Sequence, residues 1–166
     1  MTVKIPPGIA TGQQLRLQGE GEPGSAGGPA GHLFVVVHVQ EHGFFRRDGL
    51  NLFCEISVNF TTVALGGEIE VPTLDGSETV KIHEGTQTGT TLRLRGKGMP
   101  DVNGGGGRGD LFVTVQVRTP KKLSKEQRHL LDQLSKALPA EKFEPRPREV
   151  DEDERNLFDR VKDMFG

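Results

Sequence analysis

The sequence of 166 residues contains no tryptophan, no tyrosine and a single cysteine, Cys54. One cysteine cannot form an intrachain disulfide, and this chain alone cannot build a multi-cysteine zinc site. A reducing compartment therefore fits best. No run approaches the roughly 18 apolar residues of a membrane helix, and no basic segment followed by an apolar one opens the chain. We therefore expect a cytoplasmic protein that does not span a membrane.

An excess of one charge is lacking as well. The chain has 21 basic and 23 acidic residues, which gives a formal net charge of −2. This balance provides no electrostatic case for binding nucleic acid or an anionic membrane. Hydrophobic residues make up 33% of the chain and are concentrated in short runs of valine, isoleucine and leucine, so the sequence predicts a thin core.

The chain contains one segment twice. VKIPPGIATGQQLRL at residues 3–17 returns as VKIHEGTQTGTTLRL at residues 80–94. After a slip of one residue, GHLFVVVHV at residues 31–39 aligns with GDLFVTVQV at residues 109–117. Agreement over this length indicates two copies of one structural unit in tandem.

Each copy reads as strands joined by turns, because short apolar runs alternate with clusters of glycine and proline. Two further segments that resemble strands lie between the copies: LNLFCEISV, and GGEIEVP followed by an Asp-Gly turn. We expect both segments to belong to the second structural unit. No equivalent text precedes residue 3, so we expect the first unit to be incomplete at its N-terminal side. Missing strands would leave a sheet edge open. Either the chain is a fragment, or those strands come from elsewhere.

Four motifs carry a family resemblance. They are ALGGEIEVPTLDG (64–76), HGFFRRDGLNL (42–52), RGKGMP (95–100) and GDLFVTVQV (109–117). With them the chain resembles, from Val3 to its end, the C-terminal substrate-binding and dimerisation region of bacterial-type DnaJ co-chaperones. The resemblance implies an all-β fold with C-terminal helices: two tandem β-sandwich-like subdomains, then an amphipathic helix that joins two protomers. The expected parts are residues 1–43 and 44–120 for the subdomains, 121–138 for the dimerisation helix, 139–154 for a flexible linker and 155–166 for a short terminal helix.

The sequence contains no His-Pro-Asp tripeptide and no Cys-x-x-Cys-x-Gly-x-Gly repeat. The J-domain and the zinc-binding module of such proteins would therefore lie upstream of Met1, and we expect no cofactor in this chain. The resemblance implies a co-chaperone fragment that binds unfolded or extended apolar segments, forms a homodimer and supports client delivery to a DnaK-type ATPase in the intact protein. The alternative is a dimerisation scaffold with no client binding of its own. An enzyme is not expected, because no nucleophile, base and orienting group can be assembled.

In relatives the client adds beside a sheet edge of the first subdomain and places an apolar side chain in a pocket. The two copies differ on the corresponding strand face, where Phe34 and Val36 stand in place of Phe112 and Thr114. We therefore predict that Phe34, Val36 and the motif residue Phe45 contact clients. Two other interpretations stay open: Phe34 and Val36 pack on missing strands, and Phe45 is a core residue at the subdomain junction.

The C-terminal part reads as a short amphipathic helix with a Ser124–Gln127 capping box, ended by Pro139. It either packs on its own sheet or forms the dimer contact of the family. The predicted dimerisation residues are Leu123, Gln127, Leu130, Leu131, Leu134 and Leu138. Residues 139–154 are proline-rich and acidic, and a second apolar stripe, predicted to dock on the dimer, contains Leu157, Phe158, Val161 and Phe165.

Other motifs have simpler explanations. The tripeptide Arg108-Gly109-Asp110 is attributed to chance, and GEGEPG at residues 19–24 is a turn between strands and not a dinucleotide site. The histidines are scattered, so no metal site is predicted. Cys54, inside a strand-like run, is expected to be a small buried hydrophobic residue.

Overall fold

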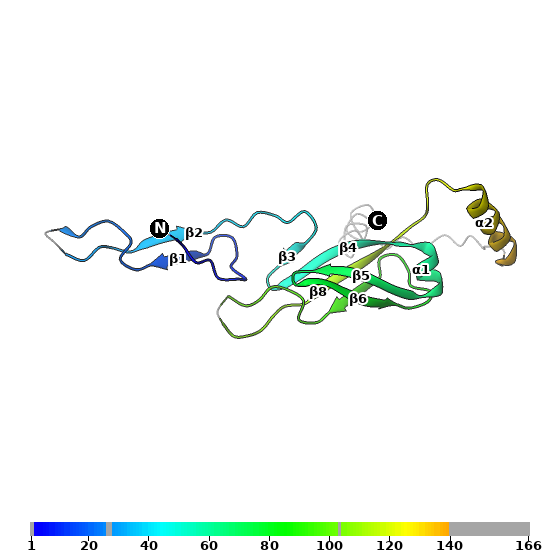
Figure 1. The fold of residues 1–166 in the computed structure, drawn as a ribbon. Helices are drawn as coiled ribbons and strands as arrows, with labels where there is room; N and C mark the ends of the chain where they lie inside the picture. The colour runs from blue at the N-terminus through cyan, green and yellow to red at the C-terminus, as the bar shows by residue number, and fades with distance from the viewer. Residues whose placement is uncertain (1, 26–27, 103, 140–166) are drawn as a thin grey trace, which may run out of the picture. The chain divides into compact units, whose positions relative to one another are not determined.

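The computed structural model describes residues 2–25, 28–102 and 104–139 (Figure 1). It separates into two compact units, Met1–Lys121 and Lys122–Gly166. Within the described residues, no helix is both long and apolar enough to cross a membrane.

The first copy of the repeat forms a two-stranded antiparallel sheet. Its strands are β1 (Gln14–Leu17) and β2 (Leu33–Val36), paired with Leu15 opposite Val35. The side chains alternate along β2, with Leu33 and Val35 half-buried and Phe34 and Val36 exposed. Among the described residues, β1 is the sole strand that pairs with β2.

The second copy contains a four-stranded sheet. Its order is β3-β4-β8-β7, and β4 runs parallel to β8 while the other neighbours are antiparallel. The strand bounds are β3 (Arg46–Asp48), β4 (Asn51–Asn59), β7 (Thr91–Leu94) and β8 (Leu111–Arg118).

A second sheet of two antiparallel strands, β5 (Gly67–Thr73) and β6 (Gly76–Ile82), covers one face of the four-stranded sheet. Their buried side chains meet between the sheets because alternate residues of each strand point to the same face. The fully buried members of this core are Val71, Ile82, Leu111, Val113 and Val115.

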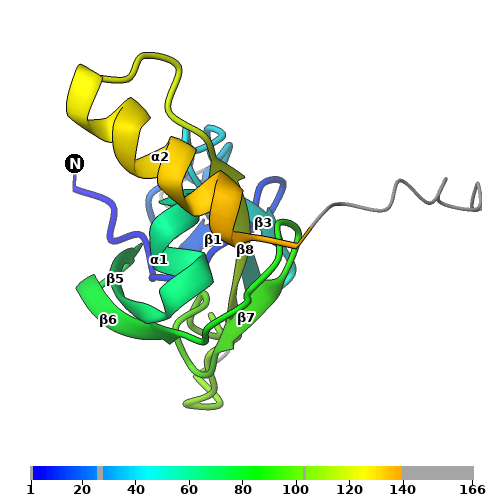
Figure 2. The ribbon, with the colours of Figure 1, turned by 90° about the vertical axis from the view of Figure 1, so that its right-hand side faces the viewer.

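One short helix, α1 (Phe60–Leu65), connects β4 to β5 and contacts both β4 and β8. It lies at one end of the second copy (Figure 1), which faces the viewer in Figure 2. Its Val63 is buried in a cluster with Val58, Ile82 and Val115. The sequence did not predict this helix.

The repeat is preserved at the level of single hydrogen bonds. Leu15 opposes Val35 in the first copy, and Leu92 opposes Val113 at the equivalent place in the second. The N–H of Val37 donates to the carbonyl of Gln13 at 2.9 Å, as the N–H of Val115 donates to the carbonyl of Thr90 at 2.9 Å. The two hairpins therefore form the same structure, and the second copy can serve as a template for the first.

The second unit contains α2 (Lys125–Ala137). The predicted capping box is present: the N–H of Gln127 donates to Ser124 Oγ at 3.1 Å, and the N–H of Ser124 donates to Gln127 Oε1 at 2.9 Å. None of the helix residues is buried.

The predicted fold class, all-β with a helix on the C-terminal side, is confirmed. The two copies differ in completeness, because the second has two packed sheets and the described first copy has one hairpin. The boundaries at residues 43 and 120 remain predictions. The predicted linker, residues 139–154, lies outside the described residues except for Pro139, and the predicted terminal helix 155–166 lies wholly outside them.

Candidate functional site

The outer face of the four-stranded sheet carries a row of four side chains, one from each strand. Phe53 on β4 stacks on Phe112 of β8 with ring centroids 5.1 Å apart and planes 13° apart. The guanidinium of Arg46 lies 5.1 Å from the ring centre of Phe53, and that of Arg93 lies 5.9 Å from the ring centre of Phe112. Each Phe face is thus covered by a ring or a cation, an arrangement that stabilises aromatic residues outside the core.

The first copy carries half of this row. Phe34 is equivalent to Phe112, and its partner across β1 is Arg16, equivalent to Arg93. No described strand lies where β4 lies in the second copy, so Phe34 is 56% exposed and Val36 is 48% exposed. Leu33 and Val35 are half-buried, whereas their equivalents Leu111 and Val113 are fully buried. The first copy therefore presents apolar side chains beside an open strand edge.

A cleft of about 1170 Å³ lies where the turn after residue 8 meets the segment that enters the second copy. Phe45 lines this cleft and also packs against the core cluster of the second copy. Its ring makes an edge contact with Phe44 at 4.9 Å, and His42 Nδ1 accepts hydrogen bonds from the N–H groups of both phenylalanines at 3.1 Å. The apolar part of the lining further includes Val39, Leu50, Leu52, Leu74, Met99 and Val102.

Arg47 lines this cleft and joins the two copies. Its guanidinium donates to the carbonyls of Gly8 and Ile9, each at 2.7 Å, and to the carbonyl of Gly49 at 2.8 Å. Gly8 has a φ of 88°, and a Cβ at this position would overlap the carbonyl oxygen of Pro100. Glycine is therefore required here for both its backbone conformation and its small size.

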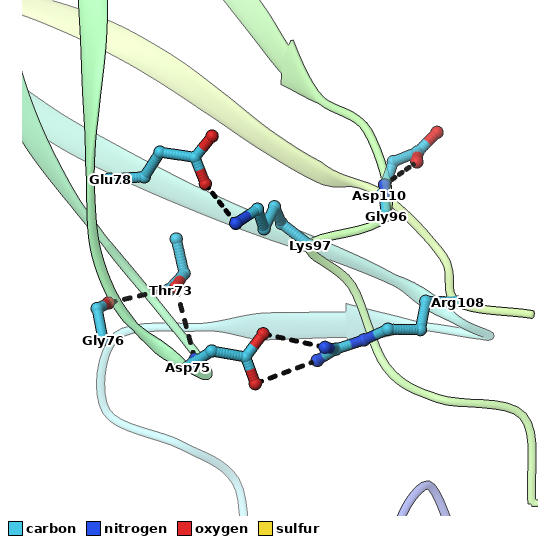
Figure 3. Close-up of polar contacts among 8 residues, drawn as sticks. All are labelled: Thr73, Asp75, Gly76, Glu78, Gly96, Lys97, Arg108 and Asp110. Atoms are coloured by element: carbon cyan, nitrogen blue, oxygen red, sulfur yellow. Dashed lines mark hydrogen bonds and ion pairs between the residues drawn. The ribbon is translucent and has the colours of Figure 1, made fainter.

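Polar contacts hold the loops beside the cleft (Figure 3). Arg108 binds both carboxylate oxygens of Asp75 in the β5–β6 turn, at 2.7 and 3.4 Å, and Lys97 pairs with Glu78 of β6 at 2.5 Å. These pairs connect the segment between β7 and β8 to the second sheet. Because both ion pairs are partly exposed, they contribute little to the free energy of unfolding. We expect them mainly to position the loops.

The carboxylate of Asp110 accepts two hydrogen bonds within the second copy. It accepts from the N–H of Gly96 at 2.7 Å and from Nε of Arg93 at 2.6 Å. The Gly96 N–H first, and the Arg93 guanidinium second, hold the pKa of Asp110 below its ordinary value. The Arg108-Gly109-Asp110 tripeptide thus has both charged side chains engaged within the chain. His32 is the equivalent residue of the first copy, where its Nδ1 accepts from the N–H of Gly19 at 3.4 Å.

Cys54 is buried in the core of the second copy, as the sequence predicted. Burial raises the pKa of its thiol, which lowers its reactivity as a nucleophile. In the part of the chain that the structure describes, no group of three or more His, Cys, Asp or Glu residues could hold a metal ion.

The residues predicted to contact clients do not form one site. Phe34 and Val36 lie on the hairpin of the first copy, and neither lines the cleft that contains Phe45. Phe45 is half-buried, in keeping with the alternative of a core residue at the junction.

The predicted dimerisation residues lie on α2 or directly beside it, with Leu123 before its N-cap and Leu138 at its C-cap. Gln127 is used in the capping box, and Leu123 and Leu131 are half-buried. Leu130, Leu134 and Leu138 are 57%, 46% and 59% exposed. The docking residues Leu157, Phe158, Val161 and Phe165 fall outside the described residues.

Sequence reasoning missed Arg47 and the row of Arg46, Phe53, Phe112 and Arg93. Arg47 donates to backbone carbonyls, which every residue has, so no residue type in the sequence indicates these contacts. For the row, a signal was available, because alternation along LNLFCEISV and GDLFVTVQV places both phenylalanines on the face opposite the core.

Comparison with known protein families agrees with the fold and with the motifs. The family model described as the DnaJ C terminal domain matches residues 1–120. This match covers both copies of the repeat and most of the chain. The family is a substrate-binding domain of chaperones and not a family of enzymes. On this evidence the chain belongs to the DnaJ C terminal domain family.

Proposed function

We propose that this chain is the client-binding and dimerising part of a DnaJ-type co-chaperone, which holds unfolded or extended apolar segments. One observation supports this most directly: Phe34 and Val36 are exposed beside a strand edge that no described strand occupies. A contiguous patch of exposed apolar side chains marks an interaction site, and Phe34 and Val36 are neighbours on one face of β2. An open strand edge adds backbone hydrogen bonds that any sequence can satisfy.

Client binding of this kind is broad in sequence and selective for apolar character. Hydrogen bonds to the backbone of β2 supply affinity without sequence preference, and Phe34 and Val36 favour apolar side chains on the added segment. The cleft lined by Phe45 offers a separate apolar contact. In the intact protein, the bound segment is delivered to a DnaK-type ATPase in the cytoplasm.

A specific observation also favours the scaffold function. Leu130 and Leu134 on α2 and Leu138 at its C-cap recur every four residues and are all about half exposed or more. A stripe of this kind is covered in a homodimer. Dimerisation through α2 does not depend on the first copy, so it would persist if client binding were absent.

The test is fluorescence anisotropy of a labelled, extended, leucine-rich peptide titrated with the chain. Saturable binding is expected, weakened in Phe34→Ser, with Leu65→Ser as the matched control because Leu65 is 79% exposed and lies on α1. If a folded, dimeric chain does not bind the peptide, the client-binding function is rejected and the scaffold function stands. The chain has no Trp or Tyr, so folding is checked by circular dichroism and not by intrinsic fluorescence.

A further inference from the structure

His42 holds the backbone of the segment that enters the second copy. Its Nδ1 accepts hydrogen bonds from the N–H groups of Phe44 and Phe45, both at 3.1 Å, and its ring centre lies 5.2 Å from that of Phe45. Asparagine and aspartate side chains hold turns in the same way, by accepting from backbone N–H groups a few residues further on. Histidine differs from both, because it is the side chain that ordinarily changes its charge between pH 5 and 8.

This arrangement requires a neutral imidazole. Nδ1 accepts a hydrogen bond only while it carries a lone pair, so the proton of the neutral ring is on Nε2. A second proton would convert Nδ1 into a donor that faces two other donors, the N–H groups of Phe44 and Phe45. Both hydrogen bonds would then be lost together.

The charges around His42 are balanced. The charged side chains that line the cleft with it are Glu41, Arg46, Arg47 and Asp101. Two of them are acidic and two are basic, and Arg47 donates to backbone carbonyls. This balance leaves the loss of the two hydrogen bonds as the main consequence of protonation.

The two phenylalanines that His42 holds both line the cleft. Phe44 is 40% exposed, and its ring makes an edge contact with the half-buried Phe45. Phe45 also packs against the core cluster of the second copy. Release of residues 42–45 would therefore move Phe44 first and change the lining of the cleft while the core stays folded.

We propose that His42 is a pH-sensitive switch at the cleft. The neutral imidazole holds Phe44 and Phe45 in the cleft lining, and the protonated imidazole releases the backbone of residues 42–45. The inference goes beyond the proposed function, because it concerns the conformation of this segment and does not depend on client binding at Phe34.

Nuclear magnetic resonance of the full chain tests the switch directly. At pH 8 the nitrogen-15 shifts of His42 should place its proton on Nε2. The pH is then lowered until the same shifts show that His42 is protonated. Protection of the Phe44 and Phe45 amides from hydrogen exchange, corrected for the intrinsic rate at each pH, should fall roughly 2- to 12-fold for each hydrogen bond lost. The N–H of Val115 donates to a backbone carbonyl and should keep its protection.

Two substitutions separate the titration from the contact. His42→Asn keeps an acceptor for the two N–H groups but cannot gain a proton, so both amides should stay protected at each pH. His42→Ala removes the acceptor, so both amides should lose protection at each pH. Both variants leave the other histidines in place, so titration elsewhere in the chain is unchanged. His129→Asn, on α2, is the matched control and should behave like the unchanged chain.

Several outcomes would overturn the proposal. A proton on Nδ1 of His42 at pH 8 would show that this atom is not the acceptor. Retained protection of both amides when His42 is protonated, or in His42→Ala, would show that other groups hold the segment. Loss of protection in His42→Asn on acidification would assign the pH response to another residue. None of these results bears on peptide binding at Phe34, so the switch and the proposed function can fail separately.

Discussion

Phe34 and Phe112 occupy the same position in the two copies of the repeat, yet Phe34 is 56% exposed while Phe112 stacks on Phe53 at 5.1 Å. The difference lies in the neighbouring strand and not in the residue, because both phenylalanines pair with an arginine on their other side. The same sequence position is thus packed against a neighbouring strand in the second copy and exposed in the described part of the first.

This comparison predicts that replacing the two equivalent phenylalanines by alanine lowers stability to different extents. Phe112→Ala removes a half-buried stacked ring and should lower the free energy of unfolding by about 1 to 3 kcal/mol. Phe34→Ala removes an exposed ring, so the change should be under about 0.5 kcal/mol. Urea unfolding followed by far-UV circular dichroism measures both. Equal losses would mean that Phe34 is packed in solution.

How much the sequence could predict is clearest from the repeat. The identities between residues 3–17 and 80–94 predicted that the two copies fold alike, and the structure agrees, because Leu15 opposes Val35 in the first copy and Leu92 opposes Val113 in the second. The register of each strand pair was not predicted from the sequence. The helix α1 escaped prediction, since Thr61, Thr62 and Val63 are β-branched and weak helix formers. This helix of six residues is stabilised by the burial of Val63 against other parts of the fold, and local sequence does not encode such tertiary contacts.

The site was less accessible to sequence reasoning. Phe53 and Phe112 meet through parallel pairing of strands far apart in the chain, and local patterns do not encode which distant strands pair. Phe45 was placed near the client site through family resemblance, but its packing against the core cluster depends on how the segment folds back, which one sequence does not reveal.

The junction between the copies predicts a contrast between two glycines. Gly8 and Gly12 have φ of 88° and 85°, but a Cβ at Gly8 would overlap Pro100, whereas a Cβ at Gly12 meets nothing within 4 Å. Gly12→Ala should cost about 1 to 2 kcal/mol from backbone conformation alone. Gly8→Ala should cost about 1 to 3 kcal/mol more from overlap. Thermal unfolding compares the two, and equal costs would argue against close contact at Pro100.

Asp110 predicts a pH dependence with a defined sign. Its pKa in the folded chain lies below the ordinary value of about 3.8, so the folded state favours the ionised carboxylate. The resulting stability is fully present above the unfolded pKa and is lost as the pH falls through the folded pKa. Asp110→Asn should therefore be less stable than the unchanged chain at pH 7, with the gap narrowing below about pH 4. Urea midpoints at pH 7, 4 and 3 test this; a gap independent of pH would contradict it.

Cys54 predicts slow chemical modification. Because the thiol is buried and its pKa is raised, alkylation by iodoacetamide at pH 8 should be slow in the folded chain and fast in urea. Mass spectrometry follows the reaction, and no second cysteine complicates it. Rapid modification of the folded chain would mean that β4 opens readily.

The exposed leucines of α2 predict a monomer when the stripe is charged. We expect the unchanged chain to be a dimer by analytical ultracentrifugation and Leu130→Lys combined with Leu134→Lys to be monomeric, because burying two ammonium groups in an apolar contact is costly. Lysine is a good helix former, so the helix itself should persist in circular dichroism. His129→Lys, on the opposite face of α2, is the matched control and should stay dimeric. A doubly substituted chain that remains a dimer would place the contact elsewhere, and loss of dimerisation without loss of peptide binding would separate the scaffold from the client site.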